Sequence, residues 1–262
     1  MSERDMIFDQ NILESLGIKR AHINISYKYD LESIKSSNRS ILYEFDENAK
    51  LKRKIVIRPF RKRRDSTIII FFRNDVGEIE TQVRHDPKYT YVDLMEYSDG
   101  KMIKHQNYQM KRNLNWNENI YPEKLMWSDS LAYQDNGIEV YNQFGTKYKR
   151  SKLIWNEKGN IIEVKSYDRG GKWQKTIHYK HKENLLISIE EENGNKLMYD
   201  WKKEFKYNDF GLSEEKYYKN GILEYIRKIS YSKNGLPELD LIRNEVTGKM
   251  SISEIMFFNT GN

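Results

Sequence analysis

The sequence contains no Cys, so any catalytic or metal-binding site would have to use histidine, carboxylate and hydroxyl side chains. Thiol nucleophiles, disulfides, zinc ribbons and iron–sulfur clusters are therefore excluded. The closest pair of histidines is His178 and His181. In a strand, residues three apart point to opposite faces, and no cluster of carboxylates stands beside this pair. We expect neither a metal site nor another cofactor.

Four glutamates follow successive turns at similar offsets, which raises the question of a glycosidase. They are Glu163, Glu190, Glu215 and Glu238. A paired-carboxylate mechanism needs two of them about 5–10 Å apart in a cleft. One glutamate per hairpin is better explained by pairing with Lys on a neighbouring strand. Since the sequence also has no P-loop, Gly-x-Ser-x-Gly, Gly-x-Gly-x-x-Gly or His-Glu-x-x-His motif, it predicts a protein that is not an enzyme.

A basic run, Lys50–Arg64, holds nine Lys and Arg residues and no acid. The rest of the chain has 36 cations and 39 acids, so this run accounts for the whole net charge of +6. It could contact phosphates of nucleic acid, lipid A or acidic membrane lipids. It could equally be a solvated hairpin whose like charges stop a sheet edge from pairing with other chains. The candidate binding residues in the run are Lys52, Lys54, Arg58, Arg61, Lys62, Arg63 and Arg64.

Aromatic residues make up 13% of the chain, and several precede equivalent turns, so they should lie along one edge of the sheet. This set is Tyr133, Trp155, Tyr179, Tyr207 and Tyr231. Such a row can bind sugar rings, bases or peptides, but an open sheet has little else to bury, so we favour a core role. The candidates for ligand binding by exposed aromatics are Trp116, Trp127 and Trp173.

Turn signals repeat along the chain in two interleaved series. The first has a turn Gly or Asn at 137, 159, 184, 211 and 235, with earlier members at 49, 77 and 100, and the second has Gly at 145, 170, 194, 221 and 248. Both repeat every 22–27 residues from position 137 onward, which leaves about a dozen residues for one strand and one reversal. Between turns, polar and apolar residues alternate, as in Ile161–Tyr167.

These patterns predict an all-β protein of consecutive antiparallel β-hairpins, forming an elongated, twisted meander sheet that closes at most in part. Residues 1–40 would form an N-terminal segment leading into the sheet, and residues 41–262 the hairpin repeat domain. One short helix is expected at Asn11–Gly17. The basic run and Asn107–Trp127 break the repeat, and we expect long hairpin loops or bulged strands there.

The repeated unit reads aromatic, polar tip, Gly, aliphatic, as in Trp155–Ile161 and Tyr207–Leu212. It resembles the YD (RHS-like) β-hairpin repeats of bacterial cell-envelope proteins, notably those of Bacteroidetes. Tyr-Asp occurs at 167–168 and 199–200, but most turns have Tyr-Asn, Tyr-Ser or Trp-Asn instead. The resemblance implies a short, mostly single antiparallel meander with too few repeats to close a hollow shell.

Recurring apolar and aromatic residues exclude a disordered chain, although 32% of residues are charged. No apolar run reaches the length of a signal peptide or a membrane span. Because the resemblance is to envelope proteins, we favour an exported protein whose signal has been removed. We expect a non-catalytic binding or scaffold protein that engages a protein partner, in or beside a membrane complex, through a sheet surface or edge. Carbohydrate is the alternative ligand, and nucleic acid is not expected.

Overall fold

The computed structural model describes residues 8–60, 63–113, 124–195 and 197–259. They form one short helix, α1 (Gln10–Ser15), and 18 β-strands. The strands are β1 (Ile18–Lys28), β2 (Lys35–Phe45), β3 (Leu51–Phe60), β4 (Arg63–Arg73), β5 (Ile79–His85), β6 (Tyr89–Ser98), β7 (Lys101–Lys111), β8 (Lys124–Gln134), β9 (Gly137–Asn142), β10 (Lys147–Trp155), β11 (Ile161–Asp168), β12 (Trp173–Lys182), β13 (Leu185–Asn193), β14 (Trp201–Asn208), β15 (Gly211–Lys219), β16 (Ile222–Tyr231), β17 (Pro237–Asn244) and β18 (Met250–Asn259). No helix within these ranges is long and apolar enough to cross a membrane.

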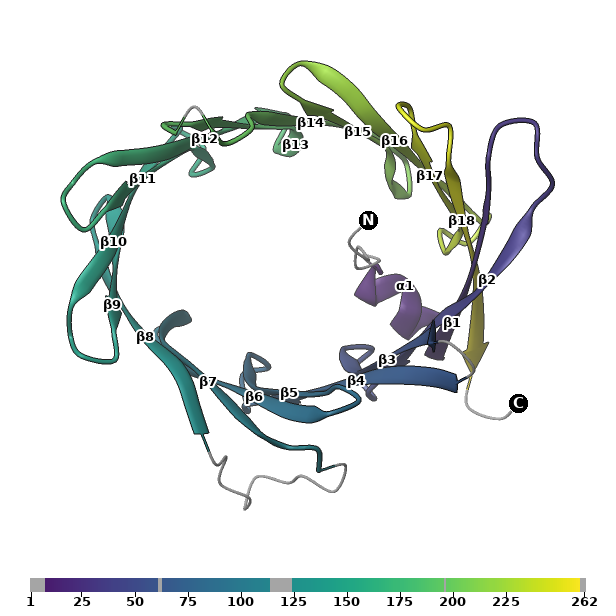
Figure 1. Cartoon of the computed structure of the whole chain (residues 1–262), viewed down its shortest axis with the longest axis horizontal. Coiled ribbons are helices and arrows are strands. Elements are labelled where there is room, and N and C mark those ends of the chain that lie inside the picture. The colour runs from purple at the N-terminus through teal and green to yellow at the C-terminus, as the bar shows by residue number, and fades with distance from the viewer. Residues whose placement is uncertain (1–7, 61–62, 114–123, 196, 260–262) are drawn as a thin grey trace.

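The strands form one antiparallel sheet that closes on itself as a ring (Figure 1). Each strand pairs with the one before it, and β1 also pairs with β18, from Ile18 opposite Asn259 to Lys28 opposite Met250. The predicted meander of consecutive hairpins is confirmed. The predicted elongated, open sheet is wrong, because β1 and β18 have similar lengths and satisfy each other's edge hydrogen bonds.

The two series of turns lie on the two rims of this ring. Turns that join an even-numbered strand to the next strand form what we call the helix rim, because α1 lies near it. The other turns form the opposite rim. The first series, from Ala49 to Gly235, falls on the helix rim and the second, from Gly145 to Gly248, on the opposite rim. The predicted interleaving is confirmed, because alternate turns of an up-and-down ring must fall on the same side.

Polar residues at the turns replace missing backbone hydrogen bonds. The Asn156 side chain accepts bonds from the backbone N–H groups two and four positions later, at 3.0 and 2.9 Å. In the same turn Gly159 has a φ of +77°, which a side chain disfavours. The same arrangement recurs at Asp46, Asn142 and Asp168. The polar tip and the Gly of the repeated unit therefore each have a geometric role.

Tyrosines that precede turns on the helix rim tie neighbouring hairpins together. Each donates its hydroxyl hydrogen to a backbone carbonyl of the hairpin before it. These bonds run from Tyr97 to Ile79 (3.1 Å), Tyr133 to Met102 (3.0 Å), Tyr207 to Leu186 (2.8 Å) and Tyr231 to Leu212 (2.9 Å). Hydrogen bonding to the preceding hairpin thus gives a structural reason for an aromatic residue, specifically Tyr, at these repeat positions.

Helix α1 shows which face of the sheet is the inner one. Leu13 belongs to one apolar cluster with Ile23, Tyr43 and Ile255, and Figure 1 shows α1 inside the ring. The predicted helix is confirmed at this position, and its packing on the wall stabilises a segment too short to fold alone. Residues directly opposite each other on paired strands share a face, so the strand register carries this inner-wall assignment around the ring.

The two faces of the ring differ in composition. On β14 and β15 the outer wall carries ion pairs such as Lys206–Glu214, at 2.9 Å, and the inner wall carries stacked aromatics such as Tyr217 and Trp201. Apolar residues instead gather on the outer wall of β3–β6. We call them the outer panel: Ile55, Ile57, Ile68, Ile70, Phe72, Val83, Val92 and Leu94. Each described strand approaches only its two neighbouring strands, so the walls stay apart across the ring.

Where the structure describes them, the two stretches expected to break the repeat are mostly strand. The loop alternative is wrong for Leu51–Phe60, which is β3, but the bulged-strand alternative is confirmed there, because the pairing with β2 shifts in register between Arg53 and Leu51. The β-branched residues Ile55–Ile57 favour an extended strand despite the surrounding charge. The bulged strand predicted in the second stretch is confirmed at Asn107–Tyr108, where β7 pairs with β8. Residues 114–123 lie outside the described residues.

Candidate binding site on the inner wall

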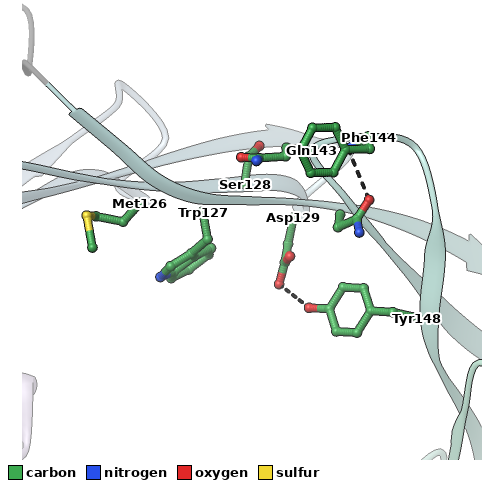
Figure 2. A pocket seen from close by; sticks show the side chains of 8 residues that line it. Met126, Trp127, Ser128, Asp129, Gln143, Phe144 and Tyr148 are labelled. Atoms are coloured by element: carbon green, nitrogen blue, oxygen red, sulfur yellow. Dashed lines mark hydrogen bonds between the residues drawn. The ribbon is translucent and has the colours of Figure 1, made fainter.

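A pocket of about 420 Å³ opens beside β8 and the turn between β9 and β10, at the opposite rim. The residues that line it are Met126, Trp127, Ser128, Asp129, Asn142, Gln143, Phe144 and Tyr148. Figure 2 shows Trp127, Asp129 and Tyr148 on one side of the sheet and Ser128 on the other. Trp127 and Asp129 share a face because side chains alternate along β8, and the register places both on the inner wall.

Tyr148 and Asp129 form the shortest polar contact in this pocket. The Tyr148 hydroxyl donates to Asp129 Oδ2 at 2.6 Å. Burial, followed by the hydrogen bond and the charge of Asp129, raises the pKa of Tyr148 to about 12. The phenol therefore keeps its proton at neutral pH and acts as a donor. Asp129 retains a second oxygen that can accept a hydrogen bond from a ligand.

A second polar group continues the site along the inner wall onto β6 and β7. His105 Nε2 lies 3.2 Å from Asp93 Oδ1, and the Asn107 amide donates to the same oxygen at 2.8 Å. The His105 and Trp127 rings meet edge to face with their centroids 4.6 Å apart. The Cα atoms of His105 and Asp129 are direct partners across β7 and β8. The indole of Trp127 is thus fixed from one side while 40% of the residue stays exposed.

This arrangement offers a ligand two kinds of contact. It offers aromatic faces next to carboxylate and amide groups in an open pocket. The Tyr148 proton is held by Asp129, and the imidazole of His105 is engaged by Asp93. Within the described ranges, no three His, Asp or Glu residues lie close enough together to hold a metal ion.

The structure distributes the basic run over both walls, so the predicted single patch is wrong for the part it describes. Alternate residues of a strand face opposite sides. Lys54 is buried on the inner wall, with its ammonium 5.6 Å from the centre of the Tyr43 ring. Arg53 points outward and binds both carboxylate oxygens of Glu44, at 2.6 and 2.9 Å. Lys52 lines an open hollow beside that pair on the outer wall.

The other candidate cations of the run are less defined. Arg58 is exposed on β3, opposite Asp65 of β4. Arg63 and Arg64 are the first residues of β4, and their side chains are not described. Arg61 and Lys62 lie outside the described residues. The described structure therefore brings none of these cations to the pocket at Trp127.

The three candidate tryptophans have different surroundings. Trp127 lies at the pocket, as described. Trp173 begins β12, and its indole N–H donates to the Thr176 hydroxyl at 2.9 Å, which gives it a structural bond. Trp116 lies outside the described residues. The structure does not gather the three into one surface.

Sequence patterns alone did not reveal Asp93, His105, Asp129 and Tyr148. They come from β6, β7, β8 and β10, and strand register alone brings them together. His105 is isolated in the sequence, and no fixed spacing links it to either aspartate. Only a correct pairing of all the strands from β6 to β10 would have found the group.

The repeating glutamates do pair with cations. Glu215 lies 3.3 Å from the Lys203 ammonium on the neighbouring strand and 3.8 Å from the Arg227 guanidinium. Glu163 contacts Lys165 at 3.0 Å and His178 at 3.4 Å. The predicted pairing of glutamate with Lys on a neighbouring strand is confirmed at Glu215, whereas Lys165 lies on the same strand as Glu163.

Comparison with known proteins gives remote structural similarity only. No family model and no curated protein matches the chain. A porin-like protein from Bacteroides uniformis has a TM-score of 0.41 at 7% identity, over 92% of this chain and 98% of that one. A porin-like protein from Bacteroides vulgatus has a TM-score of 0.26 at 8% identity, over 90% of this chain and 97% of that one. A LolA superfamily protein from Nitrosomonas europaea has a TM-score of 0.18 at 9% identity, over 98% of this chain and 96% of that one. At these TM-scores the similarities carry no argument about function.

The predicted relationship to YD repeats is wrong. That resemblance implied a short meander with too few hairpins to close, whereas 18 strands close into a ring through β1 and β18. The turn motif that suggested the relationship is explained by local chemistry. A polar side chain and a Gly are what these reversals require in any meander of hairpins.

Proposed function

We propose that this protein is a non-catalytic binding protein that takes a sugar ring into the pocket at Trp127. A sugar has an apolar C–H face, which packs on an aromatic ring, and hydroxyl groups, which donate to carboxylate and amide oxygens. The supporting observation is the exposed indole of Trp127 next to Asp129 in a pocket that also contains Phe144 and Tyr148.

The fixed geometry of the pocket supports this role. Trp127 is held at its edge by His105, and Asp129 is held by Tyr148, so neither side chain has to be ordered when a ligand binds. Of these residues, Phe144 is the most exposed, and in Figure 2 it lies in the turn between β9 and β10 on the same side of the sheet as Ser128.

The test is titration of the full chain with soluble oligosaccharides, namely cellohexaose, chitohexaose and maltoheptaose, by isothermal calorimetry. At least one should bind, and Trp127→Ala should weaken it by about tenfold or more, as expected for the loss of a central aromatic contact. The control is Trp155→Ala, because Trp155 is similarly exposed, at 46%, but lies on the helix rim. Absence of binding by all three sugars, or equal losses in both variants, would contradict the proposal.

A protein partner is the second candidate, and the outer panel favours it. The closed ring leaves no free strand edge among the described strands, so such a partner must use a wall. The outer panel is an apolar area on a wall that elsewhere carries charges, and because Val83 and Val92 are fully buried, a partner would contact its half-buried members, such as Ile70 and Leu94. Leu94→Lys should abolish capture of that partner from the source cell extract and leave sugar binding unchanged.

A further inference from the structure

The exposed apolar side chains of this protein are concentrated on one rim. Among the described residues, nine large apolar side chains are at least 57% exposed, and eight of them lie in or directly beside turns of the opposite rim. The eight are Leu31, Ile34, Phe144, Leu197, Met198, Tyr199, Ile222 and Val246. The ninth, Val76, is on the helix rim. Turn tips are ordinarily polar, so this concentration calls for a partner that covers it.

The same rim is basic, and the helix rim is acidic. We counted the described turn residues together with the two strand residues on each side, leaving out residues 60–64. The opposite rim then has 14 Lys and Arg against seven Asp and Glu, a net charge of +7. The helix rim has seven Lys and Arg against 12 Asp and Glu, a net charge of −5. The ring is therefore electrically polarised along its axis, with the exposed apolar residues at the positive end.

The apolar tips are spread around the ring. They come from five turns, and Figure 1 places the turn between β1 and β2 on the other side of the ring from the turn between β9 and β10. Leu31 and Phe144, at the tips of these two turns, are 107% and 80% exposed. A globular protein partner would need one contiguous apolar area to reach a stable interface. A broad planar surface can contact separate tips around a ring at the same time.

We infer that the opposite rim docks on the surface of an anionic lipid bilayer. The apolar tips enter the boundary between headgroups and acyl chains, and the surrounding Lys and Arg bind lipid phosphates. Charge complementarity selects this rim over the acidic one. The inference shares one residue, Phe144, with the proposed sugar site, and its test leaves Trp127 and Phe144 unchanged.

The first experiment is flotation of the full chain with vesicles. The protein should bind vesicles of phosphatidylcholine with 30% phosphatidylglycerol and should not bind pure phosphatidylcholine. Raising NaCl from 0.05 to 0.5 M should release most of it, because salt screens the contribution of the cations. No binding to the anionic vesicles would overturn the inference. Equal binding to both vesicle types would also overturn it.

Two sets of variants separate the apolar and basic contributions. Leu31→Ser with Leu197→Ser and Val246→Ser should lower the partition coefficient at least about tenfold. Val76→Ser with Leu185→Ser, two exposed positions on the helix rim, is the matched control and should bind as the parent does. Lys88→Gln with Arg169→Gln and Lys172→Gln should lower binding by about a hundredfold, since each cation near an anionic surface contributes roughly fivefold.

Site-specific labelling reports which rim touches the bilayer. The chain has no Cys, so Leu197→Cys or Val76→Cys gives a single site for an environment-sensitive NBD label. When vesicles are added, the emission of a label at position 197 should shift to shorter wavelength and become more intense. The emission of a label at position 76 should not change. Equal shifts at both positions would overturn the inference. The inference would also be overturned if the protein formed a dimer in the absence of vesicles and the triple variant at Leu31, Leu197 and Val246 abolished that dimer. A second copy of the chain would then cover the rim.

Discussion

The Arg227 guanidinium binds both carboxylate oxygens of Asp240, with Nε–Oδ1 and Nη2–Oδ2 distances of 2.9 Å each. Both side chains lie on the inner wall, on β16 and β17, and only about 5% of each residue is exposed. Glu215 completes the group at 3.8 Å from the guanidinium. Two charges so fully removed from water are tolerated only together, because each compensates the desolvation of the other.

Removal of one partner should therefore be costly. Asp240→Asn should lower the free energy of unfolding by about 3–5 kcal/mol, because Arg227 would remain buried without its main counter-charge. The measurement is equilibrium unfolding in urea followed by circular dichroism. The control is Lys206→Gln, which removes an exposed cation from a pair on the outer wall and should cost less than about 1 kcal/mol. Similar losses in both variants would show that Asp240 is not the main counter-charge of a buried Arg227.

His85 should make the protein less stable in mild acid. Burial, with a smaller effect of Arg112, lowers the pKa of His85 from its ordinary 6.5. The unfolded chain then takes up the proton first as the pH falls, so the free energy of unfolding decreases from pH 6.5 downward. His85→Gln should flatten this dependence between pH 6.5 and the lower pKa of the folded state.

The control for this experiment is His22→Gln, a half-buried histidine on β1. A parent protein with the same stability at pH 7 and pH 5.5 would contradict the prediction.

The Tyr231 hydroxyl should contribute to the cohesion of neighbouring hairpins. Tyr231→Phe removes its bond to the Leu212 carbonyl and should cost about 1 kcal/mol, with little change in packing. Tyr199→Phe is the control, since Tyr199 lies 57% exposed in a turn. The prediction would be wrong if thermal unfolding midpoints of the two variants agreed.

Gly235 should resist substitution more than Gly170. It has a φ of +78°, and a β-carbon there would lie 2.8 Å from Ile12 Cδ1 of α1. Gly235→Val should thus destabilise by about 2–4 kcal/mol through backbone strain and displacement of the helix. Gly170→Val is the matched control, because Gly170 has no positive φ and space around it. A control variant as unstable as Gly235→Val would refute the assignment of strain.

The sequence by itself determined the local structure. Polar tips and glycines such as Asn156 and Gly159 set the positions of the reversals, because their side-chain bonds and backbone angles depend on near neighbours only. Alternation within strands such as Ile161–Asp168 set the β-structure, and the two series of turns set an up-and-down order. All of these signals extend over a few residues, so reading along the chain recovers them.

Tertiary structure decided the rest. Closure depends on β1 meeting β18, which come from opposite ends of the chain, and no local pattern encodes that contact. The register between β7 and β8 brings His105 opposite Asp129, and closure makes the face of β3 with Lys54 the inner wall and the face with Arg53 the outer wall. Closure also collects the turns into two rims and so turns scattered residues such as Leu31 and Phe144 into one surface. Such juxtapositions arise because paired strands place residues side by side that are far apart in sequence.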